Sequence, residues 1–287
     1  MVGRRGWTLS ALGRHIWGLV LRSLVSSART MMRFVVYGGG KHVCPVCGSR
    51  ARKFVSLRKI AGGILVRPVW IDGQFIGPEN YEFLNIENFA CDLCGAPDKA
   101  RLVAWFMETE GFERLKKSGS PLLHFDPEPG MAHYLTRGFF EYLPTSWPEK
   151  LFPNSFDITD LSEVEGEIGG FICSHILEHV DSDSIAAEQL FRALAPGGFG
   201  IVLVPIIRLL EKTWEVEGEL SEQDRWKFFG QGDHVRIYSK SGLREVLEGA
   251  GFTVRELGVD HFGDEAFQKF ALTKSSTLYV LEKNLEG

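Results

Sequence analysis

Residues 168–206 read IGGFICSHILEHVDSDSIAAEQLFRALAPGGFGIVLVPI, and this stretch decides the fold. Two apolar runs flank a polar turn, an amphipathic segment and a Pro-Gly-Gly turn. Continuous apolar runs are typical of strands that helices cover on both faces, and a strand–helix–strand order indicates a parallel crossover. The stretch therefore predicts the centre of an α/β sheet. Its His/Glu turn should lie at the carboxyl end of a strand, where such sheets bind ligands.

The same alternation continues on both sides of this stretch. Apolar runs at 122–125, 140–143, 252–257 and 276–283 predict further strands, and periodic segments at 97–117, 184–194 and 240–251 predict helices. We therefore expect a doubly wound, mostly parallel sheet. Ahead of it, residues 54–57, 63–71 and 81–86 predict short strands bounded by turn residues such as Asp72-Gly73.

The composition is that of a globular protein with one strong charge asymmetry. The chain has 287 residues, of which 44% are hydrophobic and 24% charged, and this excludes disordered, collagen-like and coiled-coil classes. Its net charge of −5 argues against a dedicated nucleic-acid binder. The first 71 residues, however, hold 13 Lys and Arg residues and no acidic residue. The chain is thus predicted to have a basic N-terminal part and an acidic remainder.

Residues 7–36 predict one basic amphipathic helix within an N-terminal region of residues 1–40. Leu9, Leu12 and Ile16 recur at helical spacing, and the arginines lie off that stripe. Such a helix packs on its own domain or on a partner subunit, or adsorbs to an anionic membrane surface; its acid-free composition also fits a transit peptide. No apolar run has the length of a membrane span, and no signal peptide is evident. We expect a cytoplasmic protein, with peripheral membrane contact as an open alternative.

Four of the five cysteines form two Cys-x-x-Cys pairs, Cys44/Cys47 and Cys91/Cys94, each followed by glycine. A tight turn brings both thiolates of a pair toward one tetrahedral ion, and the glycine permits the positive φ that the turn needs. Four thiolates leave no ligand position vacant, so we predict one structural Zn²⁺ ion in a zinc-ribbon domain, residues 41–96, whose intervening strands form its hairpin. Two local disulfides or a redox pair are the alternatives. Cys173, in an apolar run, is predicted to be a buried small hydrophobe.

Three further motifs follow the cysteine pairs along the chain. A predicted strand runs into Pro127-Glu128, the run HILEH occupies 175–179, and the run FGQGDHVRIY occupies 229–238. In this order, residues 121–260 resemble the class I S-adenosylmethionine-dependent methyltransferases, and the whole set is similar to a type 11-like bacterial subgroup with an N-terminal zinc ribbon. The resemblance implies a Rossmann-like sheet of seven strands in a methyltransferase-like domain, residues 97–287, with S-adenosylmethionine as cofactor.

The resemblance also implies which residues form the cofactor site. The turn FDPEPG at 125–130 stands where the family has a glycine-rich loop, and its two prolines remove amide donors. Ser146 stands where the family has an acid for the ribose hydroxyls, and Asp157 and Asp160 match the region near adenine. The predicted cofactor-binding residues are Asp126, Glu128, Gly130, Ser146, Asp160, Ser174 and His175.

Histidines are the candidate bases for an oxygen or nitrogen acceptor, because imidazole titrates near neutral pH. The predicted catalytic residues are His234, His175 and Asp233. Glu178-His179 is also compatible with a structural pair at a helix start, and Arg236 with either an acidic substrate group or Asp233.

The sequence thus predicts methyl transfer from S-adenosylmethionine to a small-molecule acceptor, without specific nucleic-acid binding. The alternative is a non-catalytic, zinc-stabilised relative used as a scaffold, which the proline-containing turn and Ser146 favour. An oxidoreductase with a nucleotide cofactor is a further alternative, against which the missing G-x-G-x-x-G stands. A nucleic-acid methyltransferase is the last alternative, suggested by the basic, cysteine-bearing N-terminal part.

Overall fold

A computed structural model describes residues 40–60, 67–138, 140–146 and 151–284. The helix predicted at 7–36 lies outside the described residues. Among the residues described, no helix has both the length and the apolar character needed to cross a membrane.

The centre of the molecule is a mostly parallel sheet of six strands in the order β11-β12-β8-β7-β5-β6. The five strands other than β12 run in one direction, and β12 is antiparallel to both of its neighbours, β8 and β11. The prediction of a mostly parallel α/β sheet is confirmed. The strands are β5 (Leu122–Phe125), β6 (Tyr142–Thr145), β7 (Ile168–Ser174), β8 (Leu194–Leu203), β11 (Thr253–Leu257) and β12 (Leu278–Glu282).

The seventh expected strand is not found among the described residues. At the β6 edge, Thr145 and Asn154 form one isolated parallel bridge. Pro153 lacks the amide that a ladder bond needs, and the amide of Phe156 donates instead to the Thr145 hydroxyl, at 2.8 Å. Side-chain hydrogen bonding thus replaces a continuous strand at this edge.

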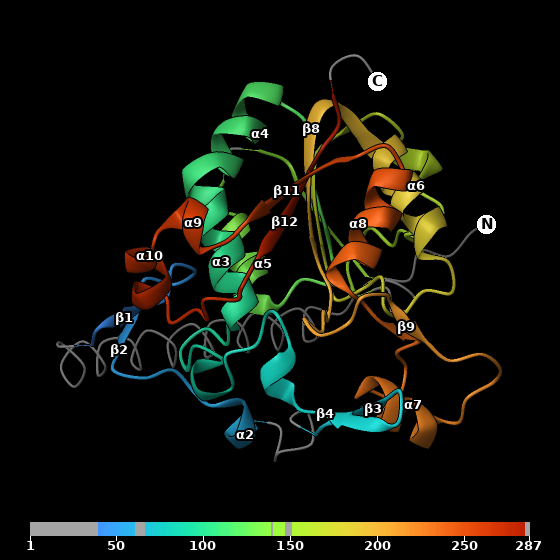
Figure 1. The fold of residues 1–287 in the computed structure, drawn as a ribbon. Helices are drawn as coiled ribbons and strands as arrows, with labels where there is room; N and C mark the ends of the chain where they lie inside the picture. The colour runs from blue at the N-terminus through green and yellow to red at the C-terminus, as the bar shows by residue number, and fades with distance from the viewer. Residues whose placement is uncertain (1–39, 61–66, 139, 147–150, 285–287) are drawn as a thin grey trace, which may run out of the picture.

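Helices cover both faces of the sheet, so the molecule has three layers (Figure 1). One layer contains α3, α4, α5, α9 and α10, and the other contains α6 and α8. Neighbouring strand residues alternate between the two cores: Ile172 and Ile201 pack toward the first layer, whereas Phe171, Cys173 and Val202 pack toward the second. The prediction that Cys173 is buried is confirmed. The helices are α3 (Asp98–Phe106), α4 (Phe112–Ser118), α5 (Pro129–Leu135), α6 (Asp183–Ala193), α8 (Lys240–Gly249), α9 (Val259–Phe262) and α10 (Asp264–Lys269), and a π-helical turn, Met107–Gly111, joins α3 to α4.

Serine caps fix where the helices after the sheet strands begin. The hydroxyl of Ser182 accepts from the amide of Ile185 at the start of α6, and Ser239 accepts from Gly242 at the start of α8. Each cap satisfies an amide that has no partner inside the helix. The helix α6 therefore begins at Asp183, which leaves residues 175–182 as an irregular turn between β7 and α6.

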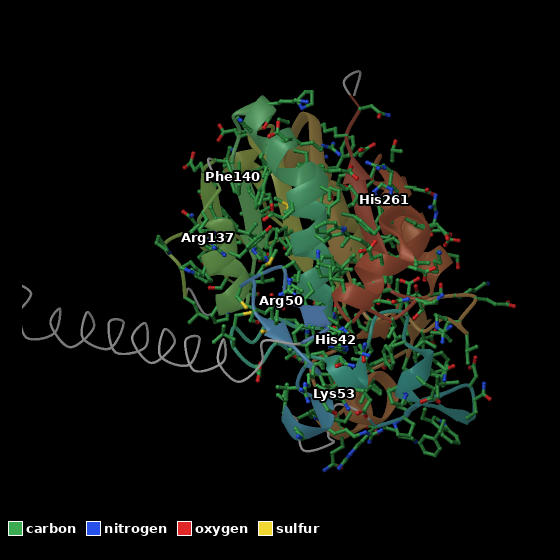
Figure 2. All side chains as sticks on the ribbon, turned by 90° about the vertical axis from the view of Figure 1, so that its left-hand side faces the viewer. His42, Arg50, Lys53, Arg137, Phe140 and His261 are labelled. Carbon is green, nitrogen blue, oxygen red and sulfur yellow. The ribbon has the colours of Figure 1, made fainter. Side chains whose placement is uncertain are left out.

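The segment before α3 divides between two cores and does not form one compact unit around the cysteines. The short pair β1 (His42–Val43) and β2 (Arg50–Ala51) lies beside the cysteines, and Figure 2 shows His42 and Arg50 there. The hairpin β3 (Val69–Ile71) and β4 (Gln74–Ile76) turns at Asp72-Gly73, which both have positive φ. It packs on Ile207, Phe229 and Ile237 of the later insert, so the hairpin expected in the ribbon supports a different region.

Two of the short strands expected here are wrong. Leu57–Ile60 is the helical turn α2, and Val55 makes only an isolated bridge to Ala90. In 81–86, Tyr81 makes one bridge to Ile207, and the short helical turn Ile86–Asn88 follows. These segments pair with residues far away in sequence, which local apolar patterns do not reveal.

The insert after β8 packs against this hairpin. It contains β9 (Trp214–Glu215), α7 (Glu222–Phe229) and β10 (Arg236–Ile237), with β9 and β10 antiparallel. Figure 1 shows β3, β4, α7 and β9 together at one end of the sheet. This assembly places the loop at 230–235 next to the turn that follows β7, where the amide of Val235 donates to the carbonyl of Glu178, at 2.9 Å.

Candidate active site

A cavity of about 1060 Å³ opens at the carboxyl ends of β5 and β7. This is the edge where parallel α/β sheets bind ligands. Its walls come from α3, from the turns after β5 and β7, from residues 151–159 and from the loop after α7. The lining residues are Lys99, Phe125, Asp126, Glu128, Leu151, Phe156, Asp157, Ile158, Thr159, Ser174, His175, Ile176, His179, Val180, Asp181, Ser182, Ile185 and Asp233.

Both strands end in a residue with left-handed backbone. Asp126, after β5, has φ 41°, and His175, after β7, has φ 59°. Non-glycine residues adopt this conformation rarely, and it is characteristic of functional turns. The amide of Asp126 donates to the carbonyl of Thr145 and that of His175 to the carbonyl of Leu203, each at 2.8 Å, so neighbouring strands hold both turns in place.

The cavity wall is rich in carboxylates. Lys99 is the lysine among the lining residues, and its Nζ lies 3.4 Å from Glu128 Oε1. Burial favours the neutral form of Glu128, but the Lys99 ammonium, a backbone amide and His124 together outweigh it and hold the pKa of that carboxyl below its ordinary value. The wall therefore favours a ligand with positive charge. The carboxylates on the wall are Asp126, Glu128, Asp157, Asp181 and Asp233.

Four of the predicted cofactor-binding residues lie on this wall, namely Asp126, Glu128, Ser174 and His175. They come from the two strand ends, so the fold brings together residues about 50 positions apart in the chain.

Gly130, Ser146 and Asp160 are not among the lining residues that the structure describes. A side chain at Gly130 would meet the backbone oxygen of Cys94 at 2.5 Å, so this glycine allows helix α5 to approach the second cysteine pair. The buried hydroxyl of Ser146 accepts from the amide of Leu151, at 2.7 Å. Asp160 accepts from the hydroxyl of Ser162, at 2.8 Å.

Behind the cavity lies a cluster of histidine and glutamate side chains. Glu178 is fully buried, and its Oε1 lies 2.9 Å from Nδ1 of His175. Burial favours its neutral form, but the imidazoles of His175 and His234 outweigh it, so the pKa of Glu178 lies below its ordinary value. Nδ1 of His179 lies 3.2 Å from Oδ2 of Asp233. Three of these side chains, His175, His179 and Asp233, reach the cavity wall.

His234 does not line the cavity but packs behind His179. The two rings meet edge to face with their centroids 4.6 Å apart. His234 is 6% exposed, and burial lowers its pKa to about 4. At neutral pH its imidazole is therefore neutral. Of the three residues predicted to be catalytic, His175 and Asp233 thus face the cavity and His234 supports the group from behind.

Arg236 fixes the turn that carries this cluster. Its guanidinium donates to the carbonyls of Leu177, Val180 and Asp181 at 2.6–3.0 Å, and its Nε lies 2.7 Å from Glu215. With its side chain 6% exposed, it holds backbone and does not face a ligand. Of the alternatives left open for Arg236, the pairing with Asp233 is wrong, since the carboxylates that it meets are Glu215 and Asp183.

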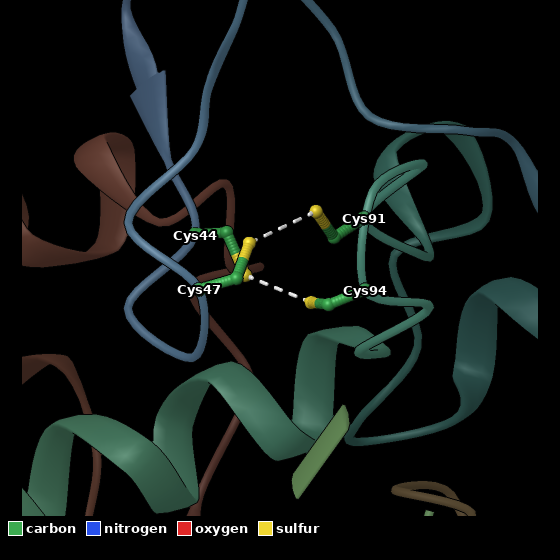
Figure 3. Close-up of side chains that lie close together, drawn as sticks. All are labelled: Cys44, Cys47, Cys91 and Cys94. Atoms are coloured by element: carbon green, nitrogen blue, oxygen red, sulfur yellow. Dashed lines mark hydrogen bonds between the residues drawn. The ribbon is translucent and has the colours of Figure 1, made fainter. Parts of the chain in front are cut away.

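The four cysteines predicted to bind zinc meet at one point (Figure 3). Sγ of Cys44 lies 3.7 Å from that of Cys94, and Sγ of Cys47 lies 3.8 Å from that of Cys91. A tetrahedral zinc ion with Zn–S bonds of about 2.3 Å keeps its sulfurs roughly 3.8 Å apart, so this group fits one ion. All four thiols are free, so the disulfide alternative does not hold.

The two cysteine turns have the same geometry. In each, the amide of the following glycine donates to the carbonyl of the first cysteine, at 2.8 Å. Gly48 has φ 74° and Gly95 has φ 75°, which confirms the positive φ expected from the sequence.

This cysteine cluster adjoins the cavity. Gly130 of α5 contacts the second cysteine turn, and Arg137, labelled in Figure 2, donates to the carbonyl of Val46 in the first. Lys99 reaches the cavity from the start of α3, five residues after Cys94. The cysteine cluster therefore supports the wall that carries Glu128.

Lys99 and Glu178 are not predicted as site residues from the sequence. Lys99 gave no signal, because a lysine in the first turn of a helix is ordinary. For Glu178 the sequence leaves a structural pair at a helix start as an alternative, but α6 begins only at Asp183, with Ser182 as its cap. Asp157 was considered beside Asp160, and only Asp157 lines the cavity.

The fold and the cavity define an α/β protein with a ligand site at the carboxyl edge of a Rossmann-like sheet. Residues 90–257 match a family model described as a methyltransferase domain. This match spans more than half of the chain, and the chain belongs to that family of S-adenosylmethionine-dependent methyltransferases. No sequence among the curated proteins matches it.

Solved structures resemble the chain at low identity. The CurJ carbon methyltransferase is 16% identical with a TM-score of 0.41, over 65% of this chain and 53% of that one. The [4+2]-cyclase SpnF is 15% identical with a TM-score of 0.43, over 81% and 98%. Phosphoethanolamine N-methyltransferase 2 of Haemonchus contortus, in complex with S-adenosyl-L-methionine, is 11% identical with a TM-score of 0.38, over 61% and 52%. The chain thus spans about half the length of two of these three structures.

Proposed function

We propose that the protein transfers a methyl group from S-adenosylmethionine to a small-molecule acceptor bound at the carboxyl edge of the sheet. The observation that carries this proposal is the carboxylate-rich wall of a 1060 Å³ cavity at the ends of β5 and β7. S-adenosylmethionine carries a sulfonium and an ammonium, which such a wall complements. Asp126 and Glu128, at the end of β5, would hold the ammonium, and Asp157, also on the wall, would accept from a hydroxyl of the ligand.

His175 is the group that we propose takes the acceptor proton. It lines the cavity, its side chain is 38% exposed, and its Nδ1 lies 2.9 Å from the buried carboxylate of Glu178. A carboxylate beside one ring nitrogen orients an imidazole and stabilises its protonated form. When bound, S-adenosylmethionine supplies an electrophilic methyl group that carries its own leaving group. The chain then has to align the acceptor and remove its proton.

The charge of the wall supports a small acceptor. A nucleic acid approaching this cavity would bring phosphates toward Asp126, Asp181 and Asp233, whereas nucleic-acid sites require lysine and arginine around the groove. We also propose that Cys44, Cys47, Cys91 and Cys94 bind one structural Zn²⁺ ion, which would fix the support of α5.

Calorimetric titration of the full chain with S-adenosylmethionine and with S-adenosylhomocysteine tests the proposal. We expect saturable binding, weakened about tenfold or more by Asp126→Asn, since a charge-assisted contact contributes roughly 1.5–3 kcal/mol. Asparagine tolerates the left-handed backbone at this position. Asp160→Asn removes the same charge outside the cavity and should bind like the wild type.

Absence of binding up to millimolar ligand would overturn the enzymatic proposal. It would favour the alternative scaffold function, for which the two prolines of the 125–130 turn are the supporting feature. Equal weakening by both aspartate substitutions would show that the cavity is not the cofactor site.

A further inference from the structure

A second group of side chains has the donors for a metal ion. One ligand atom each from Glu178, His179 and His234 lies within 4.8 Å of the others. Glu178 and His179 come from the turn between β7 and α6, and His234 comes from the loop after α7. This group is separate from the four cysteines, and it contains no sulfur.

Buried polar atoms without partners point to a ligand at this place. Glu178 is 0% exposed, and neither of its carboxylate oxygens has a hydrogen-bond partner among the described residues; only the His175 ring lies within ion-pair distance. Nδ1 of His234, which is 6% exposed, also has no partner among them. Because Oε1 of Glu178 lies 2.9 Å from the His175 ring, Oε2 of Glu178 and Nδ1 of His234 are the two atoms left for an occupant. Leaving such atoms unsatisfied costs about 1–3 kcal/mol each.

We propose that Glu178, His179 and His234 bind a divalent transition-metal ion at the edge of the cofactor cavity. Two imidazoles and one carboxylate are a known ligand set for such ions, and they leave coordination positions open. Four thiolates, in contrast, close the coordination sphere of zinc.

The surroundings hold these three ligands in position. Asp233 lies 3.2 Å from Nδ1 of His179, which is the carboxylate–histidine pairing that orients metal-binding imidazoles. The amide of Val235 donates to the carbonyl of Glu178, at 2.9 Å, and so joins the two segments that supply the ligands. Arg236, next in the chain, fixes the carbonyls on both sides of Glu178 and His179.

The open positions of the ion would face the acceptor. His179, His175 and Asp233 line the cavity, while Glu178 and His234 lie behind them. A bound metal ion acidifies a coordinated hydroxyl, so the acceptor class that fits is a molecule whose nucleophilic oxygen and a neighbouring oxygen chelate the ion. This assignment of the acceptor rests on the proposed function, whereas the metal site does not.

Manganese binding tests the site without requiring activity. The full chain, with its zinc content measured at about one ion per molecule, is titrated with Mn²⁺ while electron paramagnetic resonance records the free aqueous ion. Thiolates suit zinc, and mixed nitrogen and oxygen donors accept Mn²⁺, so the two sites are read separately. We expect about one Mn²⁺ per chain and at least tenfold weaker binding in Glu178→Gln and in His234→Ala.

His133→Ala is the matched control, because it removes an exposed histidine of α5 far from the cluster in sequence. It should bind Mn²⁺ like the wild type. If Glu178→Gln fails to fold, His179→Gln and His234→Ala carry the test. Binding of Mn²⁺ that none of these substitutions weakens, or no Mn²⁺ binding by a folded wild type, would overturn the site.

Calorimetry on the same proteins separates this inference from the proposed function. His234 does not line the cavity, so His234→Ala should lose Mn²⁺ and still bind S-adenosylmethionine. Cofactor binding without any metal binding would refute the metal site alone, and metal binding without cofactor binding would refute the methyl-transfer proposal alone.

Discussion

The two groups of metal-type side chains differ in how the chain builds them. The four cysteines come from two local turns of similar geometry, and the pairs Cys44/Cys94 and Cys47/Cys91 hold their sulfurs 3.7 and 3.8 Å apart. Glu178 and His179 share one turn, but His234 comes from a loop more than 50 residues later, and the three donor atoms contain no sulfur. The first group is compact and closed, as a structural site requires. The second is open toward a cavity, as a functional site requires.

The cysteine group also contacts the segments that form the cavity wall around Asp126 and Glu128. The second cysteine turn touches Gly130, and α5 begins directly after the turn that carries Asp126 and Glu128. Lys99, which pairs with Glu128, follows the same cysteine turn. Loss of the cysteine site should therefore disturb the cavity at the ends of β5 and β7 as well as the fold.

Breaking the cysteine site should have the largest effect. Cys91→Ser is expected to abolish zinc binding and to destabilise the protein by about 4 kcal/mol or more, because a structural metal site contributes folding free energy directly. Metal analysis and thermal unfolding measure both effects. Cys173→Ala, which removes a buried thiol from the sheet, should keep its zinc. A Cys91→Ser protein that retains one zinc ion per chain would contradict the assignment.

Weakening the contacts by which Arg236 supports the Glu178, His179 and His234 group should have an intermediate effect on stability. Arg236→Lys keeps the charge but loses the planar fork that reaches three carbonyls, and we expect about 3 kcal/mol of lost stability, measured by chemical denaturation, together with weaker Mn²⁺ binding. Arg255→Lys is the control, because the Arg255 side chain is 34% exposed and its ion pairs should contribute about 1 kcal/mol or less. Equal losses in the two variants would contradict a special role of Arg236.

The sequence predicts those elements whose structure depends on residues close together in the chain, and it does not predict those that depend on distant contacts. The strands around 122–125, 168–174 and 253–257 follow from apolar runs, and the cysteine turns follow from spacing plus glycine, since each is decided within a few residues. The hairpin at 69–76 was expected beside the cysteines, but its apolar face is buried by Ile207 and Phe229, which lie more than 130 residues away. No local pattern contains that contact.

The candidate site shows the same limit. The ends of β5 and β7 were predicted to carry Asp126, Glu128, Ser174 and His175, and the structure places all four on the cavity wall. Ser146 and Asp160 are implied only by the resemblance, and neither lines the cavity, because Ser146 accepts from Leu151 and Asp160 from Ser162. The role of His234 behind His179 depends on how the insert folds back, which the sequence does not specify.

A buried glutamate outside both groups gives the smallest expected effect and sharpens the contrast with Glu178. Glu82 is 6% exposed, and both of its oxygens accept from the hydroxyl of Tyr279, at 2.9–3.1 Å. Burial raises the pKa of Glu82 to about 7, and the opposing effects of the Tyr279 hydroxyl and of the Lys240 ammonium are smaller. The folded state therefore holds this proton more tightly than the unfolded chain, and the resulting stability is present at low pH and is lost as the pH rises through about 7.

Glu82→Gln keeps a neutral hydrogen-bonding group at every pH, so it should gain stability relative to the wild type as the pH rises. From pH 5 to pH 8, we expect the difference in the free energy of unfolding to move by about 2 kcal/mol in favour of the variant. Denaturation at several pH values measures it. Glu87→Gln, at an exposed glutamate paired with Lys53, should show a nearly constant difference over that range. If the Glu82→Gln difference is also constant, Glu82 is charged in the folded protein at pH 5, and burial does not suffice to keep this carboxyl neutral.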